Sequence, residues 1–148
     1  VVYDEESSLE VAYALVLTKN LYGYVLLKYM AVLPWYRGKG VGIAAMRLIN
    51  KRYADRQGII AELTSFEDED GSMIKGLRKF FARFGYVVVD SDYRIGGAPV
   101  ELMVKPIKGT FEIEPVEHRI IRDFYTRILN PFAMDKMIDI RPVRKPEE

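Results

Sequence analysis

The sequence predicts a mixed α/β fold in which helices pack on a central sheet. Its 148 residues suffice for one domain with a sizeable core. Short apolar runs that suit buried strands alternate with segments in which apolar residues recur at helical spacing. In chain order, these patterns indicate three strands, a helix, a strand, a helix, two strands and a final helix.

The N-terminal part of the chain contains the first three strands. Residues 1–5 form a short strand, which a polar run ends. Two apolar runs follow, over residues 11–17 and 24–33, and the Asn and Gly between them are typical of a hairpin connection. Because both runs are continuously apolar, we expect strands that are central in the sheet and buried on both faces. Pro34 ends the second run, since proline cannot donate a hydrogen bond to a neighbouring strand.

Two helices surround the next strand. A glycine-rich turn leads into a helix over residues 40–53, and a strand over residues 59–64 follows it. The second helix covers residues 72–84, with Ser72 as the expected N-cap and Gly85 at the C-terminal end. The apolar residues expected to face the core are Val41, Ala44, Ala45, Leu48 and Ile49 in the first helix, and Met73, Leu77, Phe80, Phe81 and Phe84 in the second.

The C-terminal part adds two strands and a helix. We expect the strands over residues 86–90 and 100–104, and the helix over residues 116–129. This helix is amphipathic, so it either packs on its own domain or contributes to a homodimer. The chain is then a single domain over residues 1–148, with a core over 1–106 and a C-terminal extension over 107–148 whose last eight residues are frayed.

The composition excludes several classes of protein and site. No apolar run reaches the ~18 residues that a membrane span needs. The chain has no cysteine, so disulfides and thiolate sites are excluded, and its single histidine, His118, excludes a multi-histidine zinc site. We expect His118 to be a solvated surface residue. The N-terminal residues do not resemble a signal peptide, so we expect a cytoplasmic protein with no membrane partner.

The charges are balanced overall but locally segregated. With 22 basic and 21 acidic residues the net charge is +1, which argues against a nucleic-acid partner. One basic block nevertheless precedes an acidic stretch, which predicts a small, multiply charged anion as ligand. The basic residues of this block are Arg37, Lys39, Arg47, Lys51, Arg52 and Arg56.

The glycine-rich turn is the most informative motif. Gly38, Gly40 and Gly42 stand at alternate positions between a buried strand and a helix. Glycines there let a ligand approach the main chain, and the free N–H groups of a helix N-terminus bind anions. Arg37 and Lys39 add charge suited to phosphate oxygens. The turn predicts a pyrophosphate site; the alternative is an ordinary glycine-rich loop on a solvated basic face.

Two other nucleotide-binding motifs fit less well. The spacing of a Walker loop is absent. A Rossmann reading is closer, because Gly40, Gly42 and Ala45 fit G-x-G-x-x-A and Glu62 follows about 20 residues later. A Rossmann strand, however, runs directly into its first glycine, whereas the segment LPWYRGK intervenes here. A nicotinamide-binding protein therefore stays an alternative, but not the preferred one.

The segment R-G-K-G-V-G, with Arg37, Gly40 and Gly42 in the defining places, resembles the (Q/R)-x-x-G-x-(G/A) signature of the GNAT N-acetyltransferase superfamily. The lead-in AVLPWYRGKG and the later segment RKFFARFGY also resemble that family, over residues 1–105 in all. The resemblance implies a mixed, mostly antiparallel sheet flanked by helices, and direct acetyl transfer from acetyl-coenzyme A to a primary amine of a small molecule or peptide. It also implies that the family's first strand and helices are not in this sequence.

The resemblance assigns roles to particular residues. The backbone of Ala31 and Val32 would pair with the pantetheine arm, and the N–H groups of Gly38, Lys39, Gly40, Val41 and Gly42 would hold the pyrophosphate, near the side chains of Arg37 and Lys39. The second helix, with Phe81, would flank the cofactor.

The catalytic groups depart from the family pattern. Phe81 stands where the family often has a tyrosine that serves as general acid, and Ile74 stands where it often has Asn. Glu62, in the strand IIAELT, is the candidate general base, with an outward-facing strand residue as the alternative. Tyr29, Tyr86 and Tyr93 are alternative acids, although aromatic residues in strands are usually core. The rival function is a non-catalytic module that binds coenzyme A and has lost its general acid.

Overall fold

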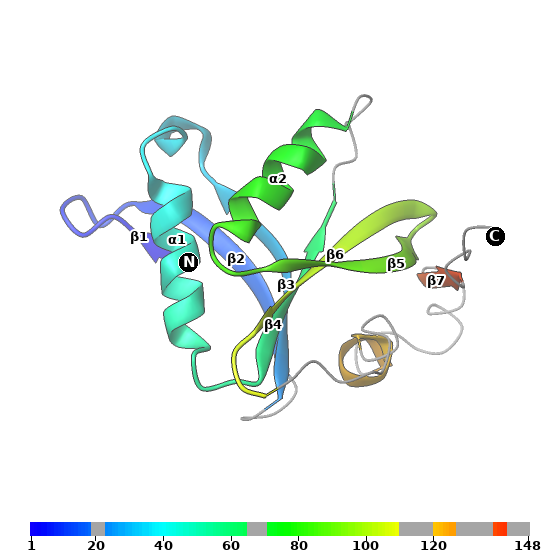
Figure 1. Cartoon of the computed structure of the whole chain (residues 1–148). Helices are drawn as coiled ribbons and strands as arrows, with labels where there is room; N and C mark the ends of the chain where they lie inside the picture. The colour runs from blue at the N-terminus through cyan, green and yellow to red at the C-terminus, as the bar shows by residue number, and fades with distance from the viewer. Residues whose placement is uncertain (19–22, 65–70, 110–119, 127–137, 142–148) are drawn as a thin grey trace.

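The computed structural model describes residues 1–18, 23–64, 71–109, 120–126 and 138–141. Its strands form one seven-stranded sheet in the order β1-β2-β3-β4-β6-β5-β7, and α1 and α2 lie on one face of it (Figure 1). The predicted mixed α/β fold, with a mostly antiparallel sheet flanked by helices, is confirmed. The elements are β1 (Val2–Tyr3), β2 (Glu10–Thr18), β3 (Tyr24–Val32), a 3-10 turn (Pro34–Tyr36), α1 (Val41–Arg52), β4 (Gly58–Leu63), α2 (Ser72–Ala82), β5 (Val87–Ile95), β6 (Ala98–Pro106), a π-helical turn (Ile121–Tyr125) and β7 (Ile138–Arg141).

The pairing of β3 with β4 is the one parallel pairing of the sheet described, and it is short. It runs from Tyr24 opposite Gly58 to Leu27 opposite Ala61. Although β3 continues to Val32, no further residue of it pairs with β4. The register of β3 on β2 also shifts at this point, so that Lys28 is an extra residue, a β-bulge. We call the gap between the unpaired ends of β3 and β4 the splay.

The two faces of the sheet carry two separate cores. The helical face, against α1 and α2, is built around buried residues such as Leu27, Met46 and Phe81. The opposite face, which we call the C-terminal face, packs against residues 120–126, where Ile120, Phe124 and Tyr125 are buried. Side chains alternate between faces along a strand, so consecutive residues of β4 serve both cores. Each part of the buried sheet thus separates one apolar layer from another.

The prediction that the second and third strands are buried on both faces is wrong for one end of them. Tyr13, Leu15 and Tyr29 are 43%, 53% and 50% exposed. Ala14 and Val16 of β2 pack on the helical face. No described element covers the opposite face of the sheet around Tyr13 and Tyr29, whose rings lie against each other there.

Both helices were placed within two residues of their ends, but their details differ. In α1 the buried residues are Ala45, Met46 and Ile49, whereas Leu48 is 52% exposed. In α2 the N-cap is Gly71, at φ 73°, rather than Ser72. Met73 of α2 is exposed, and Ile74 packs on the core instead. These differences arise because each helix is rotated slightly about its axis, so that the residues facing the core are not quite those that spacing alone predicts.

The C-terminal strands are longer than expected. β5 extends past residue 90 to Ile95, because a bulge between Val89 and Tyr93 carries the strand on along β6. β7 was not predicted; it pairs with β5, with Arg141 opposite Asp92, so the prediction of a frayed tail is wrong for Arg141. The rest of that tail, residues 142–148, lies outside the described residues. Half of the predicted helix over residues 116–129 also lies outside them, and its described part contains the π-helical turn. In the described part of the chain, no helix is long and apolar enough to span a membrane.

Candidate active site

The turn between β3 and α1 presents uncapped backbone amides. Gly38 and Gly40 have φ of 74° and 79°, in the left-handed region that residues with a Cβ rarely adopt. Gly40 is the N-cap of α1, and no side chain bonds to the N–H groups of the first turn. No atom lies within 4 Å of where a Cβ would stand on either glycine, so the surface beside the amides is open. This arrangement suits an anion.

Several of the predicted cofactor residues lie together at this turn. Ala31 and Val32 end β3 beyond its last pairing with β4. The Arg37 guanidinium donates a hydrogen bond from Nε to the Val32 carbonyl oxygen, at 3.2 Å, and so ties the turn to the end of the strand. Lys39 Nζ lies 5.8 Å from the centre of the Tyr36 ring. Arg37 therefore has a positioning contact, and the Val32 oxygen keeps a second lone pair for another donor.

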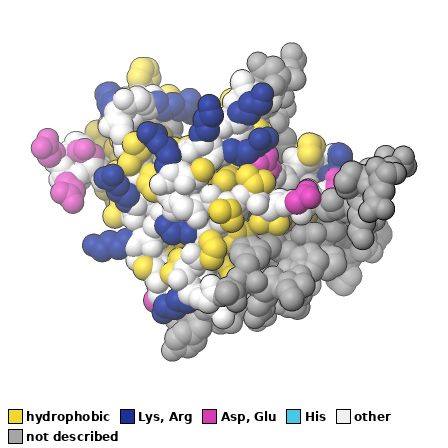
Figure 2. All heavy atoms as spheres, in the orientation of Figure 1, with side chains coloured by type: hydrophobic (Ala, Val, Ile, Leu, Met, Phe, Trp, Pro, Cys, Tyr) yellow, Lys and Arg dark blue, Asp and Glu magenta, His cyan; other side chains and the backbone are white. Residues whose placement is uncertain are grey.

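The helices beside the turn expose only basic charges. Neither α1 nor α2 contains an acidic residue. Figure 2 shows Lys and Arg side chains gathered over the face that the two helices form. The field of this face favours a multiply charged anion near the N-terminus of α1. The exposed basic residues of the helices are Arg47, Lys51, Arg52, Lys75, Arg78 and Lys79.

The splay opens into a cavity of about 120 Å³ between the strands. Its walls come from β3, from the end of β4 and from α2. Phe81 lines it and is itself 5% exposed, with its ring edge-on to Tyr86 at 5.1 Å. The lining residues are Leu27, Lys28, Tyr29, Met30, Glu62, Leu63, Thr64, Leu77, Phe80 and Phe81. Among them, Lys28 and Glu62 carry the charges.

Glu62 is the centre of a polar cluster at the splay. Among the described residues it is the one charged residue that is buried. Lys28 Nζ donates to its Oε2 at 2.6 Å, and the Tyr93 hydroxyl donates to its Oε1 at 3.1 Å. The Tyr125 hydroxyl lies 3.0 Å from Oε1 and 3.2 Å from Oε2, and Lys28 also donates to the Tyr125 oxygen. The alternative of a solvent-facing Glu62 is excluded, because its side chain is 1% exposed.

The two tyrosines of this cluster are held in the neutral form. Burial raises the pKa of Tyr93 far above its ordinary value, and the negative charge of Glu62 raises it further. Burial and the charge of Glu62 raise the pKa of Tyr125 in the same way. Both hydroxyls therefore remain hydrogen-bond donors to the carboxylate across the physiological pH range. The cluster pairs one carboxylate with one ammonium and keeps both at the wall of the cavity.

The sequence analysis found only part of this cluster. Of the alternative acids, Tyr93 belongs to it, whereas the Tyr86 hydroxyl donates to Asn50 Oδ1 at 3.1 Å on the helical face. Lys28 was missed because a single polar residue in an apolar run does not by itself indicate a bulge. Tyr125 was missed because it is 97 residues from Lys28 in the chain. His118 and the acidic residues 67–70 lie outside the described residues.

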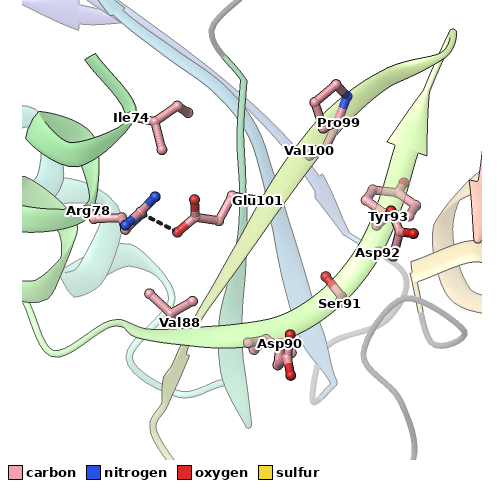
Figure 3. Close-up of a pocket in the computed structure, with 11 residues that line it drawn as sticks. Ile74, Arg78, Val88, Asp90, Ser91, Asp92, Tyr93, Pro99, Val100 and Glu101 are labelled. Atoms are coloured by element: carbon pink, nitrogen blue, oxygen red, sulfur yellow. Dashed lines mark ion pairs between the residues drawn. The ribbon is translucent and has the colours of Figure 1, made fainter. Parts of the chain in front are cut away.

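A second, larger hollow of about 650 Å³ lies between α2 and the strands β5 and β6. Figure 3 shows Asp90, Ser91 and Asp92 of β5 along one side of it and the ion pair between Arg78 and Glu101 across from them. Arg78 Nε lies 2.6 Å from Glu101 Oε1. None of the predicted cofactor residues lines this hollow. Of the predicted site residues, Glu62 and Phe81 line the smaller cavity, which lies at the splay.

Solved structures of several acetyltransferases share this fold. An acetyltransferase of the GNAT family from Bacteroides thetaiotaomicron matches with a TM-score of 0.65 and 18% identity, over 86% of this chain and 70% of that one. The ribosomal-protein-S18-alanine N-acetyltransferase from Escherichia coli matches with a TM-score of 0.53 and 15% identity, over 75% and 70%. An aminoglycoside 6'-N-acetyltransferase complexed with coenzyme A matches with a TM-score of 0.52 and 15% identity, over 74% and 73%.

Sequence comparison gives the family. A search of curated protein sequences found no match. A family model described as an acetyltransferase (GNAT) domain matches residues 1–88, which is more than half of the chain. The predicted resemblance is confirmed, and the chain belongs to the GNAT acetyltransferases, acyltransferases whose acetyl donor is acetyl-coenzyme A.

Proposed function

We propose that this domain transfers the acetyl group of acetyl-coenzyme A directly to a primary amine, and that the reaction takes place at the splay. The observation that carries the proposal is the cavity between β3 and β4, which has a buried carboxylate in its wall. The strand β3 continues from this cavity, through the glycine turn, to the uncapped N-terminus of α1. One arrangement thus offers a site for phosphates and a site for proton transfer.

The cofactor would be held by the turn and by the end of β3. The amides of Gly38 to Gly42 and the ammonium of Lys39 suit the pyrophosphate, and the open space beside Gly40 leaves room for it. The unpaired edge of β3 at Ala31 and Val32 suits the amide groups of the pantetheine arm, which would pair with it as an added strand does. Phe81 and Phe80 supply an apolar wall from α2. When bound there, acetyl-coenzyme A supplies an activated acetyl group and a thiol leaving group.

Glu62 is the base in this proposal. It takes a proton from the acceptor amine, directly or through a water molecule, because it is the carboxylate that lines the cavity among the described residues. Its hydrogen bonds to Tyr93 and Tyr125 fix its orientation. Phe81 has no proton to donate, so a proton delivered to the sulfur side of the cavity comes from water or from the Lys28–Tyr125 pair.

The acceptor class is a small molecule or a peptide with a primary amine. Structural relatives bear names of both kinds, one for a ribosomal-protein alanine and one for an aminoglycoside. A cytoplasmic location and a homodimer belong to the same proposal, as expectations from the sequence alone.

A thermal-shift titration with acetyl-coenzyme A tests the cofactor site. At about 100 times the dissociation constant, binding adds about 2.7 kcal/mol to the free energy of unfolding, a rise in Tm of roughly 5–10 °C. Gly40→Val should remove the shift relative to its own baseline, because valine cannot adopt φ of 79° without strain. Gly76→Ala, an exposed change in α2, is the matched control and should keep it.

Turnover on a panel of primary amines tests the reaction. Release of coenzyme A that depends on the amine supports transfer. A shift with acetyl-coenzyme A but no turnover on any amine would contradict the catalytic proposal and favour a binding module. A parallel titration with NAD should give no shift, because no Rossmann arrangement is present in the described sheet.

A further inference from the structure

The splay already contains a primary amine. Lys28 is the bulge residue of β3, and its side chain lines the cavity. The side chain is 24% exposed, so the ammonium is neither sealed in the core nor free in solvent. A bulge re-aims a side chain relative to a regular strand, and here it places the amine at the point where the β3–β4 pairing ends.

The same amine has a base in contact with it. Glu62 Oε2 lies 2.6 Å from Lys28 Nζ. Glu62 is the group to which the proposed function assigns the proton of an acceptor amine. An amine acceptor at this site therefore has to share Glu62 with Lys28 or displace it. Lys28 therefore already makes the contact with Glu62 that an acceptor amine would need.

We propose that Lys28 is an acetyl acceptor of its own domain, a site of self-acetylation that uses acetyl-coenzyme A bound in the splay. The proposal rests on the cofactor placement of the proposed function. In the reaction the ammonium first gives one proton to solvent. The Nζ–C bond then forms, the C–S bond breaks, and the second proton passes through Glu62 to the sulfur. One ammonium and one thioester give one amide, one thiol and one free proton.

Acetylation would change the charge of the cluster. The product is a neutral amide, so the ion pair with Glu62 is lost. Glu62 keeps its hydrogen bonds from Tyr93 and Tyr125. A cationic acceptor that later enters the splay then meets a carboxylate without a competing ammonium. Acetylation of Lys28 would thus free Glu62 from its ion pair, so that the carboxylate can take a proton from another amine.

Peptide mass spectrometry after incubation with acetyl-coenzyme A tests the transfer. We expect Lys28 to gain one acetyl group much faster than Lys51, an exposed lysine of α1 that serves as the internal reference for uncatalysed acetylation. Gly40→Val should slow acetylation of Lys28 to the rate of Lys51, because the cofactor site is lost. Glu62→Gln should slow it by about 100-fold, the loss expected for a general base. Acetic anhydride, which needs no cofactor site, should favour the exposed Lys51 instead.

A footprint on the wild-type protein tests the placement without any transfer. Coenzyme A lacks the acetyl group, so it cannot modify Lys28. If its thiol end enters the splay, it should protect Lys28 from acetic anhydride by several-fold and leave Lys51 unprotected. This measurement needs no variant, so it does not depend on whether Glu62→Gln folds.

The two measurements separate the two proposals. Protection by coenzyme A together with fast acetylation of Lys28 supports the inference. Protection without acetylation above the Lys51 rate overturns self-acetylation and leaves the cofactor placement standing. Acetylation of Lys28 that persists in Gly40→Val also overturns it, because the reaction is then chemical. Absence of both protection and acetylation overturns the cofactor placement as well.

Discussion

Tyr125 contributes more hydrogen bonds to the site than any residue that the sequence analysis singled out there except Glu62. Its hydroxyl contacts both oxygens of Glu62 and also accepts from Lys28. It comes from the π-helical turn on the C-terminal face, whereas Glu62 and Lys28 come from neighbouring strands. One phenol thus links the C-terminal segment to the centre of the sheet.

Removing this hydroxyl should be costly. We expect Tyr125→Phe to lower the free energy of unfolding by about 1.5–3 kcal/mol, the range for hydrogen bonds to charged groups. Urea unfolding monitored by circular dichroism measures the change. Tyr3→Phe, at a tyrosine that is 56% exposed, is the matched control and should change stability by less than ~0.5 kcal/mol. Equal effects of the two changes would show that the hydrogen bonds of this hydroxyl add nothing to stability.

Phe81 offers the opposite experiment, in which a hydroxyl is added. The residue lines the cavity, and its ring also packs against Tyr86. We expect Phe81→Tyr to raise kcat on an accepted amine, by up to about 100-fold, because the phenol can donate a proton where phenylalanine cannot. Steady-state kinetics check this. A large fall in kcat would mean that the ring packs where a hydroxyl does not fit.

The single residues of the site were predictable only in part. Glu62 stood out as a carboxylate within an apolar strand, and the structure places it at the cavity. Lys28 and Tyr125 could not be assigned, because their contacts depend on a bulge and on a pairing across 97 positions of the chain. Local patterns report which face a residue occupies; they do not report which distant segment covers that face.

At the level of elements, β4 is the strand that both cores depend on. All six of its residues are buried, and it lies between β3 and β6 in the sheet. Gly58 begins the strand, and a Cβ there would stand 2.4 Å from Tyr24 Cε1 and 2.7 Å from the Lys105 carbonyl oxygen. The strand can therefore enter the sheet only through a residue without a side chain.

Two glycine-to-alanine changes should have opposite signs. Gly58→Ala should lower the free energy of unfolding by about 1–3 kcal/mol, because the new methyl group overlaps backbone that cannot move easily. Gly76→Ala should raise it by about 0.5–1 kcal/mol, because Gly76 lies within α2 with open space around it. Chemical denaturation of both variants beside the wild type measures the pair. A stabilised Gly58→Ala would contradict the described packing of β4.

The elements themselves were largely predictable, and their edges were not. Helical spacing located α1 and α2, since both bury one stripe against the sheet. It misjudged Met46 and Leu48, because the apolar stripe of α1 is wide enough to allow more than one rotation of the helix. β7 was missed since a four-residue strand at an edge owes its pairing to β5 and carries no pattern of its own.

Across the whole molecule, buried tyrosines lie on both faces of the sheet. Tyr86 packs on the helical face, and Tyr93 and Tyr125 pack on the C-terminal face. Burial raises the pKa of all three in the folded protein above the ordinary value of 10.0. Folding thus keeps three phenols protonated that the unfolded chain would ionise in alkali.

Stability should therefore fall in alkaline solution. Above pH 10.0 the unfolded chain releases these protons and the folded protein does not, so the free energy of unfolding falls as pH rises. Each tyrosine lowers the free energy of unfolding by about 1.4 kcal/mol per pH unit above that point, and has no effect on its pH dependence well below it. Denaturation series between neutral and strongly alkaline pH measure the slope. Phenolate absorbance gives the check: part of it should appear only when the protein unfolds.

The parting of β3 from β4 gives β3 two unlike edges. One edge is bonded to β2 along nearly the whole strand, whereas the other is bonded to β4 only as far as Leu27. In hydrogen–deuterium exchange, the amides of residues 28–32 that point into the splay should exchange quickly in the free protein, while those that point to β2 should exchange slowly. Coenzyme A should slow the first set and leave the second unchanged, so that an alternating pattern along five residues would record the ligand in place of a strand. Uniform exchange along these residues, with or without coenzyme A, would contradict this picture of a half-open strand.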